Sequence, residues 1–174
     1  MRVYIPVTLA MLQRLVSEGS LRPVNGTAFA VTPTLREAYA EGDDDELAEV
    51  ALREAALASL RLLATPEVGS AEAGDARQIM PPRRAVLAAE VDEVTYRPDL
   101  DDAVVRVGAP VAVDDVIAAY VDNAAAEPDV RRALEVIDAA DLGDEDAELA
   151  VGDALDHDLA WYANQELPFL LELL

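Results

Sequence analysis

The sequence contains no cysteine and no lysine. Without cysteine, disulfides, thiolate zinc sites, iron–sulfur centres and a cysteine nucleophile are all excluded. Without lysine, Schiff-base chemistry and lysine-dependent phosphate clamps are excluded as well. A cysteine-free chain suits a reducing compartment, and we therefore expect a cytoplasmic protein.

Long apolar runs are also missing. No apolar stretch approaches the ~18 residues needed to cross a bilayer, so the sequence predicts no membrane-spanning helix and no membrane partner. The N-terminal segment is interrupted by Pro6, ends its apolar run at Gln13 and Arg14, and is not followed by a small-residue cleavage site. It is therefore predicted to be the first strand of the fold and not a secretion signal.

Positive charge is scarce. The 174 residues carry 35 acidic against 13 basic side chains, for a formal net charge of −22. Such a field repels nucleic-acid phosphates, and we expect no binding to bulk nucleic acid. Three origins of the acidity stay open: a GC-rich genome, solubility, or a binding role, of which DNA mimicry is one form. Residues 114–158 hold fifteen acidic side chains and only two arginines, whereas arginines predominate in 1–36, so an acidic and a basic end are expected.

Four strands are predicted from runs of β-branched and aromatic residues, at 2–7, 28–31, 85–91 and 103–107. Pro6 should mark the end or an edge of the first strand, because proline cannot donate to a ladder. The last two strands can form a hairpin with long arms. Residues 65–82 are rich in glycine and proline and are predicted to be a flexible loop.

Helices are predicted where capping residues precede apolar residues at helical spacing. Thr8 caps a helix that Gly19 closes, and Thr32 caps one with proline in its first turn. Asp43, Asp44 and Asp45 precede the clearest helix, whose apolar stripe is predicted to contain Ala48, Leu52, Ala55, Ser59, Leu62 and Leu63. Further helices are predicted over 113–122, from 127 to before Gly143, and from 144 onward with a break near Gly152 and a kink or stop near Pro168.

These elements predict one α+β domain over 1–174. It would consist of a small mixed β-sheet of about four strands covered by helices, with a helical C-terminal third. With 52% hydrophobic residues, a chain of this length can bury a core without disulfides or metals.

Sequence motifs of the common enzyme and cofactor classes do not occur. The chain has no G-x-G-x-x-G, G-x-x-x-x-G-K, H-E-x-x-H or G-x-S-x-G. The acidic clusters at 43–45 and 144–146 could offer oxygen ligands to Mg²⁺ or Ca²⁺, but neither has the alternating ligands of a calcium loop. Both stand where a helix begins, so we predict caps there, and neither a metal nor a cofactor.

The single histidine, His157, lies between Asp156 and Asp158 and four residues after Asp153. A neighbouring carboxylate can hold an imidazole tautomer for acid–base work, and the i, i+4 spacing suits a metal. No nucleophile, second base or third ligand is near in sequence. A histidine on a helix surface or at a cap is therefore the better interpretation, and no catalytic residue is predicted.

The most distinctive segment, 159–171, contains the only tryptophan. Large rings are rarely left in water, so we expect Trp161 to be buried against the core. Tyr162 stays open, because adjacent residues on a helix point about 100° apart. The alternative is that both rings line a recognition surface with the polar neighbours Asn164, Gln165 and Glu166.

Four stretches of the sequence resemble a known family: RVYIPVTLAMLQRL, ALASLRLLA, DAADLGDEDA and above all HDLAWYANQELPFLL. They span most of the chain and are similar to a family of small actinobacterial proteins classed only as a domain of unknown function. The resemblance implies a cytoplasmic bacterial protein with a single domain. It implies no activity and carries over no catalytic residue.

Because no set of residues converges on a reaction, we expect a non-enzymatic interaction or regulatory module that binds a protein partner. Its candidate binding residues are His157, Trp161, Tyr162, Gln165 and Glu166. The alternative is a small-molecule binder or enzyme that uses His157 with a neighbouring carboxylate, or Arg83 and Arg84 as an anion clamp. The sequence does not indicate an oligomeric state.

The large negative charge generates a prediction about salt. Repulsion among exposed carboxylates destabilises the folded state, and salt screens exposed charges beyond a Debye length of ~8–10 Å. The melting temperature should therefore rise between low and moderate sodium chloride, as measured by thermal unfolding. A melting temperature that falls steadily over the same range would contradict this.

Overall fold

A computed structural model describes residues 1–39, 41–65 and 80–173. Its strands are β1 (Arg2–Val7), β2 (Ser20–Leu21), β3 (Thr27–Phe29), β4 (Ala85–Glu90), β5 (Thr95–Tyr96), β6 (Val104–Arg106), β7 (Val111–Ala112), β8 (Val116–Val121) and β9 (Ala160–Ala163). Its α-helices are α1 (Leu9–Glu18), α2 (Pro33–Ala38), α3 (Asp44–Ala64), α5 (Glu127–Asp141), α6 (Glu145–Leu155) and α7 (Leu167–Glu172).

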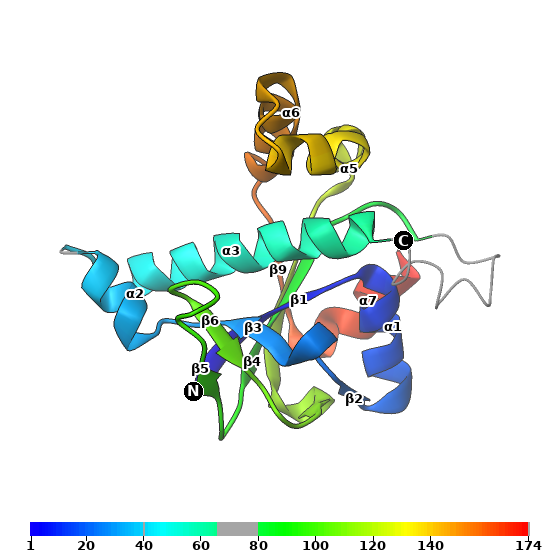
Figure 1. The fold of residues 1–174 in the computed structure, drawn as a ribbon. Coiled ribbons are helices and arrows are strands. Elements are labelled where there is room, and N and C mark those ends of the chain that lie inside the picture. Colours follow the sequence, from blue (N-terminus) through cyan, green and yellow to red (C-terminus); the bar gives the residue numbers. More distant parts are fainter. Residues whose placement is uncertain (40, 66–79, 174) are drawn as a thin grey trace.

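An antiparallel sheet of seven strands lies at the centre of the protein (Figure 1). Its strands lie in the order β5-β6-β3-β1-β4-β8-β9, and a separate small sheet pairs β2 with β7. The prediction of a mixed α and β structure is confirmed. The expected mixed sheet of about four strands is wrong in detail, because the sheet has seven strands and its pairs are antiparallel.

The predicted helix starts are confirmed where a side chain caps the backbone. Thr8 accepts a hydrogen bond from the N–H of Met11, and Thr32 accepts one from Leu35. Asp43 and Asp144 cap α3 and α6 in the same way. Gly19 closes α1 with a φ of 83°, a left-handed conformation that favours glycine.

Two strands stand where the sequence predicts helix, and this changes the C-terminal third. β8 occupies most of the segment 113–122, and β9 lies between the predicted break near Gly152 and the predicted kink or stop near Pro168, where the pattern predicts helix. A short apolar run cannot be assigned to helix or strand by periodicity alone. The neighbours decide here, because β8 pairs with β4 on one side and with β9 on the other.

The connections within the sheet also differ from the expected ones. β4 and β6 do not form a hairpin, since β3 and β1 lie between them. Pro6 does not mark an edge: it is the penultimate residue of β1, the central strand, and lies opposite Val86. The β1–β3 register consists of the pair Tyr4–Phe29 alone, so the donor that Pro6 lacks is not needed there.

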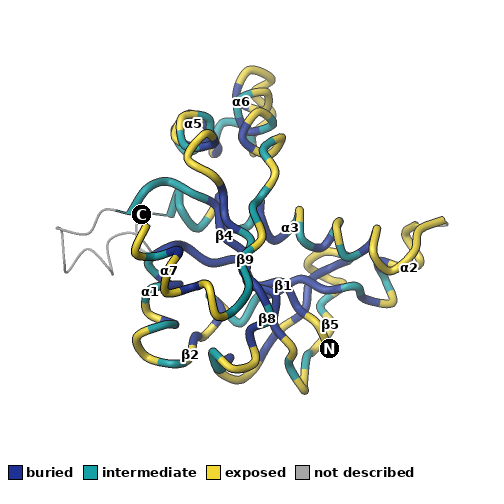
Figure 2. Tube along the Cα trace, turned by 180° about the vertical axis from the view of Figure 1, so that it is seen from behind, coloured by how far each residue is buried: buried dark blue, intermediate teal, exposed yellow. Residues whose placement is uncertain are grey.

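Helices cover both faces of the sheet (Figure 2). On one face, α1 and α7 bury Leu12, Leu15, Leu167 and Leu170 against β1 and β4. On the other face, α2 and α3 bury Leu35, Leu47, Ala51 and Ala55 against the same strands. A third cluster of apolar residues joins the far side of α3 to α5 and α6.

The apolar stripe of α3 is displaced from the predicted one. Ala55 and Ser59 are buried as expected, but the other fully buried positions are Leu47, Ala51, Ala56 and Leu60. The predicted stripe residues Ala48, Leu52, Leu62 and Leu63 are only partly buried. The reason is that α3 lies between two apolar surfaces, the sheet and the α5–α6 pair, so its apolar side chains are shared between two faces.

Two further expectations concern the loop and the membrane. The loop predicted at 65–82 falls mostly on residues 66–79, which lie outside the described residues.

In the described part of the chain, no helix is both long enough and apolar enough to cross a membrane.

Ser59 connects α3 to the two central strands. Its hydroxyl is fully buried, donates to the carbonyl of Val7 at 2.7 Å and accepts from the N–H of Ala85 at 2.9 Å. Val7 ends β1 and Ala85 begins β4, so one side chain satisfies the backbone where both strands end beneath the helix.

Ser59→Ala should lower the free energy of unfolding by about 1–3 kcal/mol, because it leaves a buried donor and a buried acceptor unpaired. Ser17→Ala is the matched control, since Ser17 is exposed on α1 and its loss should change stability by less than about 0.5 kcal/mol. Denaturant unfolding measures both. Equal stability of the two variants would contradict the bridging role.

Candidate functional site

The α5–α6 pair is an insertion between the last two strands of the sheet. The chain leaves the end of β8, forms the two helices and returns to begin β9. Figure 1 shows the pair standing on α3, away from the sheet. Val130, Ala133 and Ile137 of α5 pack with Leu60 of α3, and Arg61 of α3 pairs with Asp141 of α5 at 2.9 Å.

A buried ion pair lies at the base of this insertion. The Arg84 guanidinium donates to both carboxylate oxygens of Asp122, from Nε at 2.9 Å and from Nη2 at 2.8 Å. The backbone N–H of Arg84 donates to the same carboxylate at 2.8 Å. The two side chains are 2% and 0% exposed, so this pair is fully removed from water.

Arg84 also holds the chain that returns from the insertion. Its Nη2 donates to the backbone carbonyl of His157 at 2.8 Å. Arg84 directly precedes β4, Asp122 directly follows β8, and His157 precedes β9. One side chain therefore joins three segments that are distant in sequence at the point where the insertion meets the sheet.

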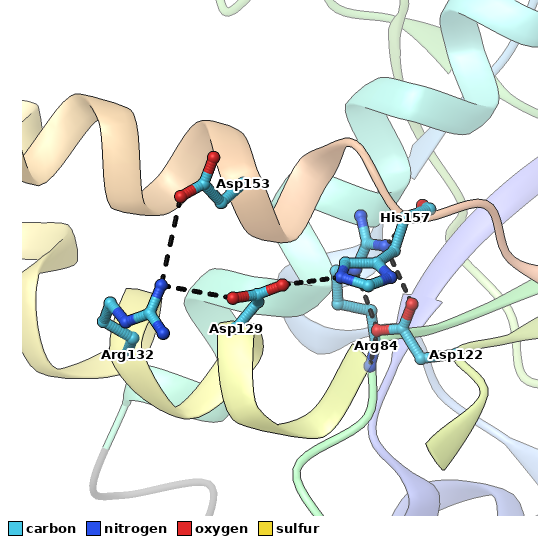
Figure 3. A network of polar contacts seen from close by, with 6 residues as sticks. All are labelled: Arg84, Asp122, Asp129, Arg132, Asp153 and His157. Carbon is cyan, nitrogen blue, oxygen red and sulfur yellow. Dashed lines mark hydrogen bonds and ion pairs between the residues drawn. The ribbon is translucent and has the colours of Figure 1, made fainter. Parts of the chain in front are cut away.

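His157 begins a second, more exposed chain of polar contacts (Figure 3). Its Nε2–H donates to the Asp129 carboxylate at 2.7 Å, and Arg132 pairs with Asp129 at 3.2 Å and with Asp153 at 3.9 Å. The hydrogen bond from His157 holds the pKa of Asp129 below its ordinary value, and the nearby charge of Arg132 acts in the same direction. These contacts join α5 to α6 and to the segment that leads into β9.

The arrangement does not favour the metal or acid–base interpretation of His157. Asp153 contacts Arg132 and not the imidazole, so the i, i+4 pair is not formed. Across residues 1–39, 41–65 and 80–173, no group of three or more His, Asp or Glu side chains could hold a metal ion. The only carboxylate within ion-pair distance of the imidazole in that part of the chain is Asp129.

Both guanidinium groups of the anion clamp considered as an alternative are already engaged by carboxylates. Arg83 donates to Glu127 from Nε and Nη2, at 3.2 and 3.0 Å, while Arg84 is held by Asp122. An anion would have to displace these carboxylates to bind there. The two arginines are better explained as anchors of the insertion.

Trp161 is not buried, contrary to the expectation. It lies in β9, the last strand of the sheet, and 58% of its surface is exposed. β9 places Trp161 opposite Tyr120 of β8, on the face that α3 covers over β1, β3 and β4. At the β9 edge this face of the sheet extends beyond α3, so the helix does not cover the indole.

Tyr162 points to the opposite face, because side chains alternate along a strand. It is partly buried against the cluster that contains α1 and α7. The adjacent rings are therefore separated by the sheet and do not form one surface. Gln165 and Glu166 follow β9 in a 3₁₀ turn and are both exposed.

The hydrogen-bonding pattern of the ladder leaves one edge position open. The N–H of Asp122 donates to the carbonyl of Arg84, so the backbone groups of Asp122 point toward β4. Because the direction alternates along a strand, the backbone groups of Val121 point toward β9, where Val121 pairs with Ala160. The backbone groups of Ala160 therefore point toward β8, and those of the next residue, Trp161, must point away from β8. The N–H and C=O of Trp161 therefore point out of the sheet, and no described residue bonds to them.

The neighbouring outward donor is closed by a side chain. The N–H of Ala163 donates to the Glu166 carboxylate at 3.0 Å. Asn164 holds the same turn against the sheet, donating to the carbonyls of Val113 and Val116 at 2.6 Å each. The open part of the β9 edge is thus centred on Trp161.

Sequence reasoning missed Asp122 and Asp129, although both are central to the geometry. The sequence predicts a helix over 113–122, and a carboxylate at the end of a helix indicates no particular partner. Its position directly after a buried strand becomes informative only when β8 is recognised, because a buried arginine then needs a partner. Asp129 lies 28 residues from His157, and no local pattern connects them.

Comparison with known proteins yields a family without an assigned activity. A family model described as "Family of unknown function (DUF6912)" matches residues 1–171. No curated protein matches the chain, and no solved structure matches it.

Asp122→Asn should lower the free energy of unfolding by about 3–5 kcal/mol, because it leaves the Arg84 charge buried without a counter-ion. Asp99→Asn is the matched control: Asp99 accepts two bonds from Arg97 at 3.0 and 2.8 Å, but this pair is exposed and its loss should change stability little. Denaturant unfolding compares the two variants. Losses of the same size would show that the buried pair does not hold the insertion.

Proposed function

We propose that this chain, which belongs to a family of unknown function (DUF6912), is a non-enzymatic protein-interaction module that binds its partner at the β9 edge of the sheet, beside Trp161. One observation carries the proposal. The only tryptophan of the chain is exposed on an edge strand, and its own backbone N–H and C=O point out of the sheet without a bond to any described residue. Tryptophan is one of the residue types enriched in binding hot spots.

The way in which β9 is held supports this role. The Arg84 bond to the His157 carbonyl, the ladder with β8 and the Asn164 bonds to two carbonyls fix both ends of the strand. An edge that is already ordered loses little conformational entropy when a partner binds. The exposed indole is thus presented on a preorganised strand and not on a loose terminus.

The alternative of an enzyme or small-molecule binder has weaker support. His157 and Asp129 form a pair that links helices, and each is about 30% exposed. No hydroxyl, amide or second carboxylate of a described residue forms a hydrogen bond or an ion pair with the imidazole. A general base must lie within hydrogen-bond reach of the substrate proton that it removes, and the described residues that bond to His157 do not define a place for a substrate.

Trp161→Ala should abolish or strongly weaken capture of a partner from the host, by about 30-fold or more in affinity if the residue is a hot spot. Its thermal stability should stay close to that of the wild type, because a mostly exposed ring contributes little to folding. Affinity capture with the tagged protein, run beside thermal unfolding, measures both.

Tyr96→Ala is the matched control, since Tyr96 is an aromatic residue on the opposite edge strand, β5, with 45% of its surface exposed. It should retain the partner. The proposal is overturned if Trp161→Ala retains the same partner with unchanged affinity, or if it unfolds the protein, since the ring would then serve the core.

A further inference from the structure

We infer that the partner binds by adding an extended segment to the sheet beside β9, with an arginine or lysine side chain over Trp161. This inference rests on the proposed function and names the chemistry of the partner. Strand addition is an established mode of peptide recognition in which backbone bonds give affinity and alternate side chains give specificity.

The backbone of β9 has the pattern that strand addition requires. The outward N–H and C=O of Trp161 can exchange two hydrogen bonds with one residue of an incoming strand. Glu166 closes the next outward donor, at Ala163. The added strand is therefore expected to run from Trp161 toward Leu159 and to be short, since β9 itself has four residues.

The alternation of side chains along an added strand would place one of its side chains beside the indole of Trp161. A residue that is hydrogen-bonded opposite Trp161 directs its side chain to the same face of the sheet, next to the ring. On its inner side, the indole already has Tyr120 as its cross-strand neighbour. An incoming arginine or lysine would lie against an aromatic surface, where cation–π attraction contributes about 0.5–2 kcal/mol.

The negative charge of the C-terminal region favours a partner with basic side chains. Residues 133–174 contain twelve acidic side chains and no arginine or lysine. Asp156, Asp158 and Glu166 flank β9 on both sides. A second copy of this chain is disfavoured, because an antiparallel β9–β9 pair centred on Trp161 would bring Asp156 of each copy toward Glu166 of the other. A basic segment would instead be attracted to the edge and steered toward it.

Trp161 provides its own test, because it is the only tryptophan and its fluorescence reports on this edge alone. The probe is a ten-residue peptide of alternating arginine and valine. Two control peptides keep its length, one with glutamate in place of arginine and one with proline at two central positions. The measurements are Trp161 emission and hydrogen exchange of the Trp161 amide, at low and at physiological salt.

The arginine–valine peptide should shift Trp161 emission to shorter wavelength and slow exchange of the Trp161 amide by about tenfold or more at saturation, because a bonded amide exchanges only when the complex opens. The glutamate peptide should do neither. The proline peptide should lose the amide protection, since it cannot form the backbone bonds. Binding of a labelled arginine–valine peptide should weaken at least about tenfold in Trp161→Ala and stay unchanged in Tyr96→Ala.

The outcomes separate this inference from the proposed function. If the proline peptide binds as well as the arginine–valine peptide, or if no peptide protects the Trp161 amide, strand addition is overturned, while loss of partner capture in Trp161→Ala would still support the interaction module. If the amide is protected but Trp161→Ala keeps its partner, the proposed function fails and the inference falls with it.

Discussion

The buried pair of Arg84 and Asp122 is the interaction on which the rest of the arrangement depends. Removing two charges from water is expensive, and the cost is met only when geometry is good and the remaining donors are satisfied. Here two side-chain bonds join the charges, the Arg84 amide adds a third, and the His157 carbonyl takes another donor. Three strand ends must therefore meet at one point, and the α5–α6 insertion has a fixed base.

The same constraint explains why the edge of the sheet is open. The insertion leaves the sheet at Asp122 and returns at His157, so both helices stand on α3 and none of their length covers β9. β9 is ordered by its neighbours but receives no further strand in the described part of the chain. Natural proteins usually protect such edges. Here the strand is short and Glu166 closes one donor, yet no described residue bonds to the outward backbone groups of Trp161.

Much of the local structure could be predicted from the sequence because its causes are local. Thr8, Thr32, Asp43 and Asp144 cap helices by bonding to an N–H three residues away, so the four helix starts are readable without tertiary information. The first strand, and the absence of sequence motifs for known chemistries, can likewise be read from local sequence. The family resemblance also agrees with the matched family of unknown function.

Features that depend on partners distant in sequence could not be predicted. The run 116–121 becomes a strand because β4 and β9 lie beside it, although its sequence also fits a helix. Arg84 offered no local sign that its partner was Asp122, 38 residues away. The sequence alone identified Trp161 as distinctive, since composition and segment are properties of the chain. Only the tertiary structure decided that it is exposed, because burial depends on whether another element covers a given face, and α3 packs on β1, β3 and β4 and leaves this edge open.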